Sequence, residues 1–248
     1  MLSPLPTTNP ATTERSRRLK MSNWCHNSMT ITGPVDEIAR FKQTCLLAHK
    51  DGPTLDFEAI KPMPGIFYDD PGQILFPDPD APEYREQVET QKAFEAQALE
   101  ATGSAHASDW ARAHWGTPGI ASFFHAWRDE PGRYECDFDT RWTPPLFIWE
   151  KLGEMFPALD FSVSGYEPLL DFALRGTIKD GKLEYELMDQ PGIWKAVDSE
   201  TGKIFSGTLK EIYAVVPNEL PIWGAAPVWD DARVGRTTVN SRSPKGNA

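Results

Sequence analysis

Several carboxylates occur in segments where apolar and polar residues alternate, the pattern of a strand with one buried face. Two carboxylates that face each other on neighbouring strands shift each other's pKa, and such a pair can serve as general acid and general base. The same pattern more often marks the solvent face of a sheet. The candidates for acid–base chemistry are Asp137, Asp139, Glu167, Asp171, Glu184 and Glu186.

Histidine is the second source of acid–base or metal chemistry, and the chain has five. His106 and His114 lie on either side of Trp110 at helical spacing. They are two turns apart, too far to chelate one metal ion, and Asp109 could join either one. We therefore expect histidines on a helix surface or at a helix end, with no metal and no cofactor.

The three cysteines, Cys25, Cys45 and Cys136, are far apart and form no C-x-x-C pair. We expect reduced, buried thiols that pack as small hydrophobic residues. Cys136 falls in the buried phase of a strand, where a reactive thiolate is costly. Ser164-Gly165 lacks the preceding glycine of a nucleophile elbow, and no glycine-rich phosphate loop is present. These absences favour a protein that is not an enzyme.

Two tryptophan-rich stretches are unusual, Trp115-Gly116-Thr117-Pro118-Gly119 and Arg141-Trp142-Thr143-Pro144-Pro145. Tryptophans bracketed by glycine and proline commonly close the edge of a core. The alternative is a groove for a ligand or partner. The residues that would line this groove are Trp115, Thr117, Trp142 and Trp149.

The elements that position these residues are clearest at 133–163. Tyr134, Cys136 and Phe138 alternate with Glu135, Asp137 and Asp139, which predicts a strand with one apolar and one wet face. Thr143 can cap a helix in which Pro144 is the first residue. The apolar face of that helix and the strand after it are formed by Leu146, Trp149, Leu152, Leu159, Phe161 and Val163.

The first part of the chain repeats this outline. A strand over 25–32, a turn at Gly33-Pro34, a helix over 35–47 and a short strand over 55–60 are expected. The tripeptide Leu-Asp-Phe occurs at 55–57 and again at 159–161. Two strand–helix–strand units predict an α+β fold of the ferredoxin-like, split βαβ kind, with an antiparallel sheet and helices on one face.

A long helical and loop insertion, 66–130, separates the two halves. Its part at 66–104 is acidic, because glutamate and aspartate outnumber Arg85 and Lys92, and helices are expected over 83–102 and 108–115. We expect a disordered basic leader at 1–21, the domain with its insertion at 22–190, a C-terminal β extension at 191–233 that includes hairpins, and a frayed tail at 234–248.

The charge of the chain limits its partners. The formal net charge is −11, and the basic residues of the first segment make the remainder more acidic still. A surface that binds nucleic acid or anionic lipid must neutralise phosphate, so we expect neither partner. No apolar run is long enough to span a bilayer, and the first residues lack the apolar core of a secretory signal. We expect a cytoplasmic protein.

Several motifs, taken in order, resemble those of the YubB-type ferredoxin-like domain family of plasmids and phages. They are Asn23-Trp24-Cys25-His26-Asn27, Ile31-Thr32-Gly33-Pro34, Phe57 with Ile60-Pro62-Met63-Pro64, Trp115-Gly116-Thr117, and Phe138-Thr140-Trp142-Pro144-Pro145. The resemblance covers about 22–175. It implies a ferredoxin-like fold and a mobile-element origin, and it supplies no established activity. Family members often have Lys-Trp after Trp-Gly-Thr, where this chain has Pro118-Gly119.

Three functions remain open. The leading hypothesis is a non-enzymatic accessory protein of a mobile element that binds a protein encoded by the host or the element. A variant is an acidic DNA mimic that uses 66–104 to inhibit a host nucleic-acid enzyme. The third is a small-molecule enzyme with its pocket between the sheet and the insertion, using carboxylates or His114 as acid–base groups.

Overall fold

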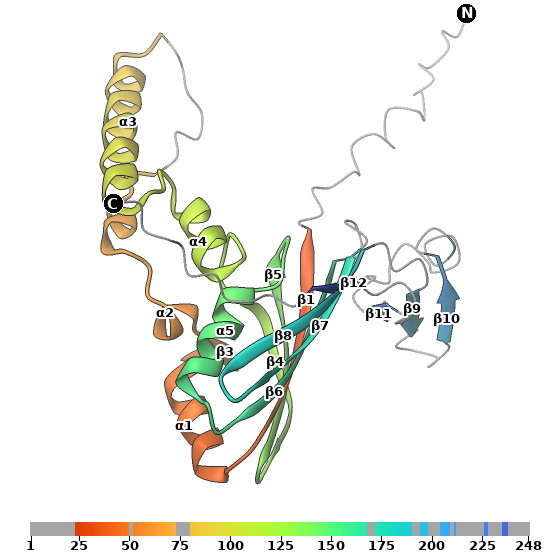
Figure 1. Ribbon diagram of the computed structural model, residues 1–248. Helices are drawn as coiled ribbons and strands as arrows, with labels where there is room; N and C mark the ends of the chain where they lie inside the picture. Colours follow the sequence, from red (N-terminus) through yellow and green to blue (C-terminus); the bar gives the residue numbers. More distant parts are fainter. Residues whose placement is uncertain are drawn as a thin grey trace, which may run out of the picture.

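A seven-stranded sheet lies at the centre of the computed structural model, with helices against one of its faces (Figure 1). The structure describes residues 23–49, 52–72, 80–167, 172–189, 194–197, 204–208, 211, 226–227 and 235–237. The predicted leader at 1–21 lies outside these residues. The strands of the sheet are β1 (Trp24–Thr32), β4 (Ser122–Glu130), β5 (Arg133–Arg141), β6 (Asp160–Glu167), β7 (Phe172–Lys179), β8 (Lys182–Asp189) and β12 (Gly235–Thr237).

The strand order is β12-β8-β7-β6-β1-β5-β4, and neighbouring strands pair antiparallel throughout. β1 lies between β5 and β6, with Asn27 opposite Phe138 on one side and Gly165 on the other. The two halves of the sequence therefore meet in one sheet, as predicted. An α+β architecture with an antiparallel sheet is confirmed.

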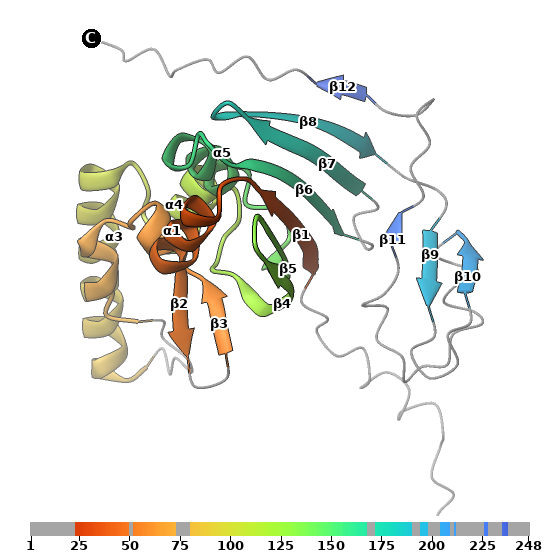
Figure 2. The ribbon, with the colours of Figure 1, turned by 90° about the horizontal axis from the view of Figure 1, so that it is seen from below.

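The helices are α1 (Val35–Cys45), α2 (Phe57–Ile60), the 3-10 helix η3 (Gly65–Asp69), α3 (Pro82–Thr102), α4 (Ala107–Trp115) and α5 (Leu146–Met155). Two smaller sheets complete the fold: β2 (Leu46–His49) with β3 (Gly52–Leu55), and β9 (Trp194–Val197) between β10 (Ile204–Gly207) and β11 (Ala226–Pro227). Figure 2 shows α1, α4 and α5 on one side of the large sheet and the β9–β11 sheet on the other.

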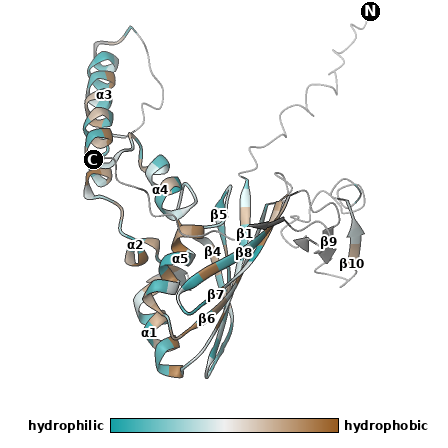
Figure 3. Cartoon of the chain, viewed as in Figure 1, coloured by the Kyte–Doolittle hydropathy of each residue, from teal (hydrophilic) through white to brown (hydrophobic). Residues whose placement is uncertain are grey.

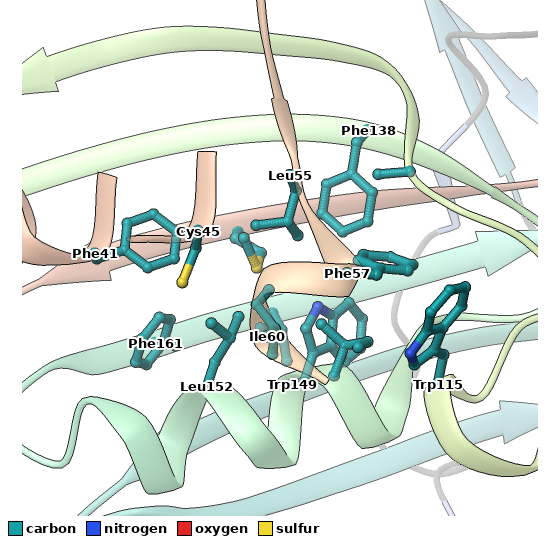
Figure 4. Packing of buried hydrophobic residues seen from close by; sticks show 14 of the residues in the cluster. Phe41, Cys45, Leu55, Phe57, Ile60, Trp115, Phe138, Trp149, Leu152 and Phe161 are labelled. Atoms are coloured by element: carbon teal, nitrogen blue, oxygen red, sulfur yellow. The ribbon is translucent and has the colours of Figure 1, made fainter. Parts of the chain in front are cut away.

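The core lies between the sheet and α1 and α5, because all three present apolar side chains to the same layer (Figures 3 and 4). β1 alternates buried and half-buried residues, with Met29 and Ile31 facing the helices. On α1, Phe41 packs edge-on against Phe156 and Phe161, with ring centroids 5.6 and 6.2 Å apart. Apolar periodicity therefore identifies the faces that form the core.

The predicted strand over 55–60 is wrong. Gly52–Leu55 forms β3, which pairs with β2 outside the large sheet, and α2 begins at Phe57. Asp56 caps that helix, because its carboxylate accepts a hydrogen bond from the Glu58 backbone N–H at 2.9 Å. Asp160, the middle residue of the second Leu-Asp-Phe, instead begins β6. The tripeptide therefore does not mark equivalent positions in the two halves.

The predicted insertion ends too late in the sequence. Helices α3 and α4 lie where they were expected, but residues 122–130 form β4 and pair with β5. β4 was missed because most of its side chains are exposed and it contains two register shifts, which remove the period of two. In the tail predicted to be frayed, Gly235–Thr237 pairs with β8 as β12. Within the predicted C-terminal β extension, β9 and β10 pair antiparallel.

Thr143 does not cap α5, contrary to the prediction. The N-cap position belongs to Pro145, and no side chain there accepts a capping hydrogen bond. The Thr143 hydroxyl instead donates to the Gly116 carbonyl oxygen at 2.6 Å. A bond that reaches another segment replaces the local cap, so Thr143 fastens the end of α4 to the start of α5.

Candidate functional site

The tryptophan-rich stretches meet at the end of the sheet where β1 begins (Figure 1). The Thr117 hydroxyl donates to the Arg141 carbonyl oxygen at 2.8 Å, which ties the segment after α4 to the end of β5. The Trp142 N–H donates to the Asn23 carbonyl oxygen at 2.8 Å and joins the start of β1 to the same place. We call this region the junction: 23–27, 115–119 and 140–146.

A buried asparagine organises the inner side of the junction. Asn27 is 1% exposed, and its Nδ2 donates to the carbonyl oxygens of Cys25 and Phe138 at 2.9 and 3.2 Å and to Thr140 Oγ1 at 2.9 Å. Thr140 Oγ1 in turn donates to the Thr143 carbonyl oxygen at 2.8 Å. Because each of these buried groups has a partner, the network fixes β1, β5 and the start of α5 relative to one another.

The predicted groove residues separate into core and surface. Trp115 and Trp149 are 1% and 0% exposed and lie among the apolar side chains of Figure 4, so they do not line an open surface. The Trp115 indole N–H donates to the Lys61 carbonyl oxygen at 2.8 Å. Thr117 is fully buried. Trp142 is 50% exposed and is the one member of the predicted set that reaches solvent.

Other large apolar side chains are exposed on the segments that adjoin the junction. Ile120 and Phe123 are 59% and 68% exposed, and the Phe123 ring packs edge-on against half-buried Trp24 at 5.4 Å. Trp24 faces Arg141 in the β1–β5 ladder, directly before Trp142. We call Trp24, Ile120, Phe123 and Trp142 the apolar patch. Exposed aromatic residues gathered in this way are typical of interaction surfaces.

Two residues of the apolar patch have strained backbones. Phe123 has φ +52° and Trp142 has φ +71°, in the left-handed region that bulky L-residues rarely adopt. Each such conformation costs on the order of 1–3 kcal/mol and persists only where the surrounding structure enforces it. At Trp142 that enforcement comes from the hydrogen bonds of the junction, which therefore hold the side chain toward solvent.

A histidine and a carboxylate form a close pair on the sheet face away from the helices. His26 Nδ1 lies 2.8 Å from Asp139 Oδ1, and both side chains are mostly buried. The Tyr166 ring lies 5.1 Å from the His26 ring. Burial raises the pKa of the Tyr166 phenol, and the charges of Asp139 and Asp137 raise it further.

The predicted carboxylates do not form one cluster. Asp137 and Asp139 share the face of His26, whereas the alternation of β6 places Glu167 on the helix side. Glu186 forms an ion pair with Arg175 at 2.8 Å on β8, the strand that also carries Glu184. Asp171 lies outside the described residues. No single acid–base site therefore brings the predicted set together.

The predicted wet face of β5 is wrong in part. Glu135 and Asp139 are 1% and 8% exposed, and only Asp137 is half-buried. β5 is an inner strand, so the side chains of its two neighbours, β1 and β4, cover its own side chains. Glu135 is compensated by Arg133 and by Arg128 at 3.5 Å. An ion pair therefore permits this burial.

The helix histidines occupy ordinary positions. His106 is the N-cap residue of α4, and the His114 ring stacks on Trp110 at 4.3 Å. Burial lowers the pKa of His114, and the charge of Lys61 lowers it further. Within the described part of the chain, no group of three or more His, Cys, Asp or Glu residues is arranged to hold a metal ion.

The acidic segment forms a helix that extends away from the sheet (Figure 1). α3 buries Phe94 and Ala98, while Glu83, Glu86, Glu89 and Glu100 are exposed. The positive charges of Arg85 and Lys92 interrupt the row, and Lys92 lies 3.5 Å from Glu89. A mimic of DNA needs regularly spaced negative charges, so these two cations reduce the fit of α3 to that role.

All three cysteines are free and buried, as predicted. Burial raises the pKa of Cys25 and Cys136, and it raises the pKa of Cys45 to about 12 although the charge of Arg40 opposes it. A thiolate is the reactive form of cysteine, so these thiols are inert in the folded protein.

We therefore expect the thiols to react with Ellman's reagent at about pH 8 only after unfolding in urea. An unfolded cysteine ionises near about pH 8.5, whereas Cys45 stays protonated in the folded chain until about 12. Stability is unaffected by this thiol below about pH 8.5 and falls as the pH rises from there toward about 12. A thiol that reacts equally fast in the folded protein contradicts this assignment.

Sequence reasoning missed His26, Tyr166, Phe123 and Arg141 as residues of this site. The facing of His26 and Asp139 depends on the register between β1 and β5, and these two residues are 113 positions apart in the sequence. The exposure of Phe123 depends on the register shift in β4. The polar phase of β1 was the available signal for His26, because it alternates with Cys25 and Asn27.

Comparisons with known proteins add little to this geometry. No family model matches the chain, and no curated protein matches it. Among solved structures, a protein api92 from Yersinia pseudotuberculosis, with the family model DUF1281, is similar at 11% identity and a TM-score of 0.35. That match covers 68% of this chain and 94% of the other. Across the described residues, no helix is both long and apolar enough to cross a membrane.

Proposed function

We propose that this chain is a non-enzymatic accessory protein that binds another protein through the apolar patch. The observation that carries the proposal is the exposure of Ile120, Phe123 and Trp142, each half or more exposed, at one end of the sheet. Burying such side chains against a partner releases the water that they hold, and aromatic residues contribute most to protein interfaces.

The rigidity of the junction supports this function. The apolar patch stands on the hydrogen bonds of Thr117, Thr143 and Asn27, which join segments distant in the sequence. A preorganised surface loses less conformational freedom on binding, so more of its contact energy becomes affinity. The strained backbones of Phe123 and Trp142 agree with a surface held in one conformation for recognition.

We also propose a ferredoxin-like core and a relation to the YubB-type family of plasmids and phages. The order β6-β1-β5-β4 supports the fold, because α1 follows β1 and α5 connects β5 to β6, as in a split βαβ arrangement. The convergence of Asn23, Gly116, Thr117, Thr140 and Trp142 at the junction supports the relation, because these residues belong to the resembling motifs. A different order of the four strands in a YubB-type protein would overturn it.

Affinity capture tests the binding function. We expect the wild-type protein to retain one stoichiometric partner from a host lysate, and the variant Phe123→Ala/Trp142→Ala to lose at least about tenfold of it, because two central aromatic contacts are removed. Tyr68→Ala is the matched control, since Tyr68 is also an exposed aromatic residue, at 66%, but lies on the helix side of the sheet. Equal capture by all three proteins would remove the proposal.

A further inference from the structure

Arg141 places a positive charge within the apolar patch. It ends β5 opposite Trp24, and its Cδ lies 3.7 Å from the position that a Cβ on Gly119 would occupy, next to exposed Ile120. Arg141 is itself exposed. Among the described residues, no carboxylate forms an ion pair with it. Arg141 is therefore an exposed cation beside Trp24 and the segment before Ile120, with no ion-pair partner among the described residues.

Three other arginines on this face of the sheet form ion pairs within the fold. Arg128 and Arg133 form ion pairs with Glu135, and Arg175 forms one with Glu186 at 2.8 Å. In each of these pairs, a carboxylate within the fold neutralises the charge of the guanidinium. Arg141 differs, since its donors are available to a ligand. In a chain of net charge −11, this exception coincides with the apolar patch.

We propose that Arg141 binds a carboxylate of the partner, so that the apolar patch recognises a peptide segment carrying an acidic residue beside apolar side chains. This inference rests on the proposed protein-binding function and names the class of partner. A guanidinium binds a carboxylate through two parallel hydrogen bonds, which fix its orientation. The apolar side chains of the peptide pack on Trp142 and Phe123, which shield that ion pair from water.

The number of charges favours a peptide over a nucleic acid. A single-stranded nucleic acid also stacks on aromatic residues, but its successive phosphates require a groove of several cations. The apolar patch offers one unpaired arginine, and Asp137 and Asp139 lie on the same face. A peptide with one carboxylate requires only one cation on the protein, which Arg141 supplies. At physiological salt, charges farther away than about 8 Å are screened, so the net charge of the chain does not prevent this contact.

A random-peptide phage-display library, selected on the full-length protein, provides the probe. We expect the enriched peptides to share an aspartate or glutamate next to aromatic or aliphatic residues. For the best peptide, we expect Arg141→Gln to weaken the Kd by at least about tenfold, with a comparable loss when the acidic residue of the peptide becomes an amide. Arg141→Glu paired with a peptide whose acidic residue becomes arginine should recover binding.

Arg112→Gln is the control, because it removes an exposed arginine of α4 outside the junction. Circular dichroism of Arg141→Gln establishes that it folds. Peptides that bind independently of Arg141 but lose binding in Phe123→Ala/Trp142→Ala overturn this inference and leave the protein-binding function standing. Peptides unaffected by either variant, or no enrichment, overturn both. Displacement of the peptide by single-stranded oligothymidylate identifies a nucleic-acid site and overturns the peptide assignment.

Discussion

Replacing Gly116 with alanine is expected to lower the free energy of unfolding by about 3 kcal/mol or more. Gly116 ends α4 with φ +91°, where an L-residue is already strained. A Cβ at this position would lie 2.8 Å from the Leu146 backbone nitrogen and 3.1 Å from the Pro144 carbonyl oxygen. Neither is the end of a flexible side chain. The backbone must therefore move, which breaks the bond from Thr143 to Gly116.

Gly103→Ala separates strain from collision, and urea unfolding measures both variants. Gly103 also ends a helix in the left-handed region, with φ +78°, but no atom lies within 4 Å of an added Cβ. We expect this control to cost only about 1 kcal/mol, which is the strain alone. Equal losses in the two variants would show that the close packing at Gly116 contributes nothing.

The second large effect is expected at Trp149. This residue is fully buried on α5, so Trp149→Ala removes its contacts and leaves a cavity, which we expect to cost about 3–5 kcal/mol in thermal or urea unfolding. The indole Nε1 has no hydrogen-bond partner among the described residues, so the loss is one of packing. The substitution breaks no hydrogen bond of the indole, so no unpaired polar group adds to the loss of stability.

Trp142→Ala is the matched comparison, because the same substitution is made at a side chain that is 50% exposed. We expect a change in unfolding free energy within about 1 kcal/mol, together with the loss of partner capture described above. The two tryptophans would then differ in both measurements, one supporting the core and the other supporting binding. A Trp142 variant as unstable as the Trp149 variant would place both in the core.

Apolar periodicity predicted most of the central layer. The alternation around Tyr134 and Phe138, and the helical spacing of Leu146, Trp149 and Leu152, identify β5 and α5 correctly because these faces lie against the core. The glycine after Trp115 predicted the end of α4 for a backbone reason that is local. Structural features that depend on residues close together in the sequence can therefore be predicted from the sequence.

The site was less accessible to sequence reasoning because it depends on contacts between distant segments. The two tryptophan-rich stretches lie together at the junction, but one contains buried Trp115 and the other contains exposed Trp142. Their exposure follows from the course of 116–121 past the end of β5, which no periodicity encodes. Likewise, β4 escaped prediction because an exposed edge strand with register shifts has no apolar alternation.

The strand order also constrains how the protein is made. β1 leaves the ribosome well before both of its partners, because β5 and β6 are synthesised more than a hundred residues later. Until then, Met29 and Ile31 have no sheet to join. Strand pairing over such a sequence distance slows folding and leaves the apolar side chains of β1 exposed during translation. Nascent chains with exposed apolar strands depend on chaperones.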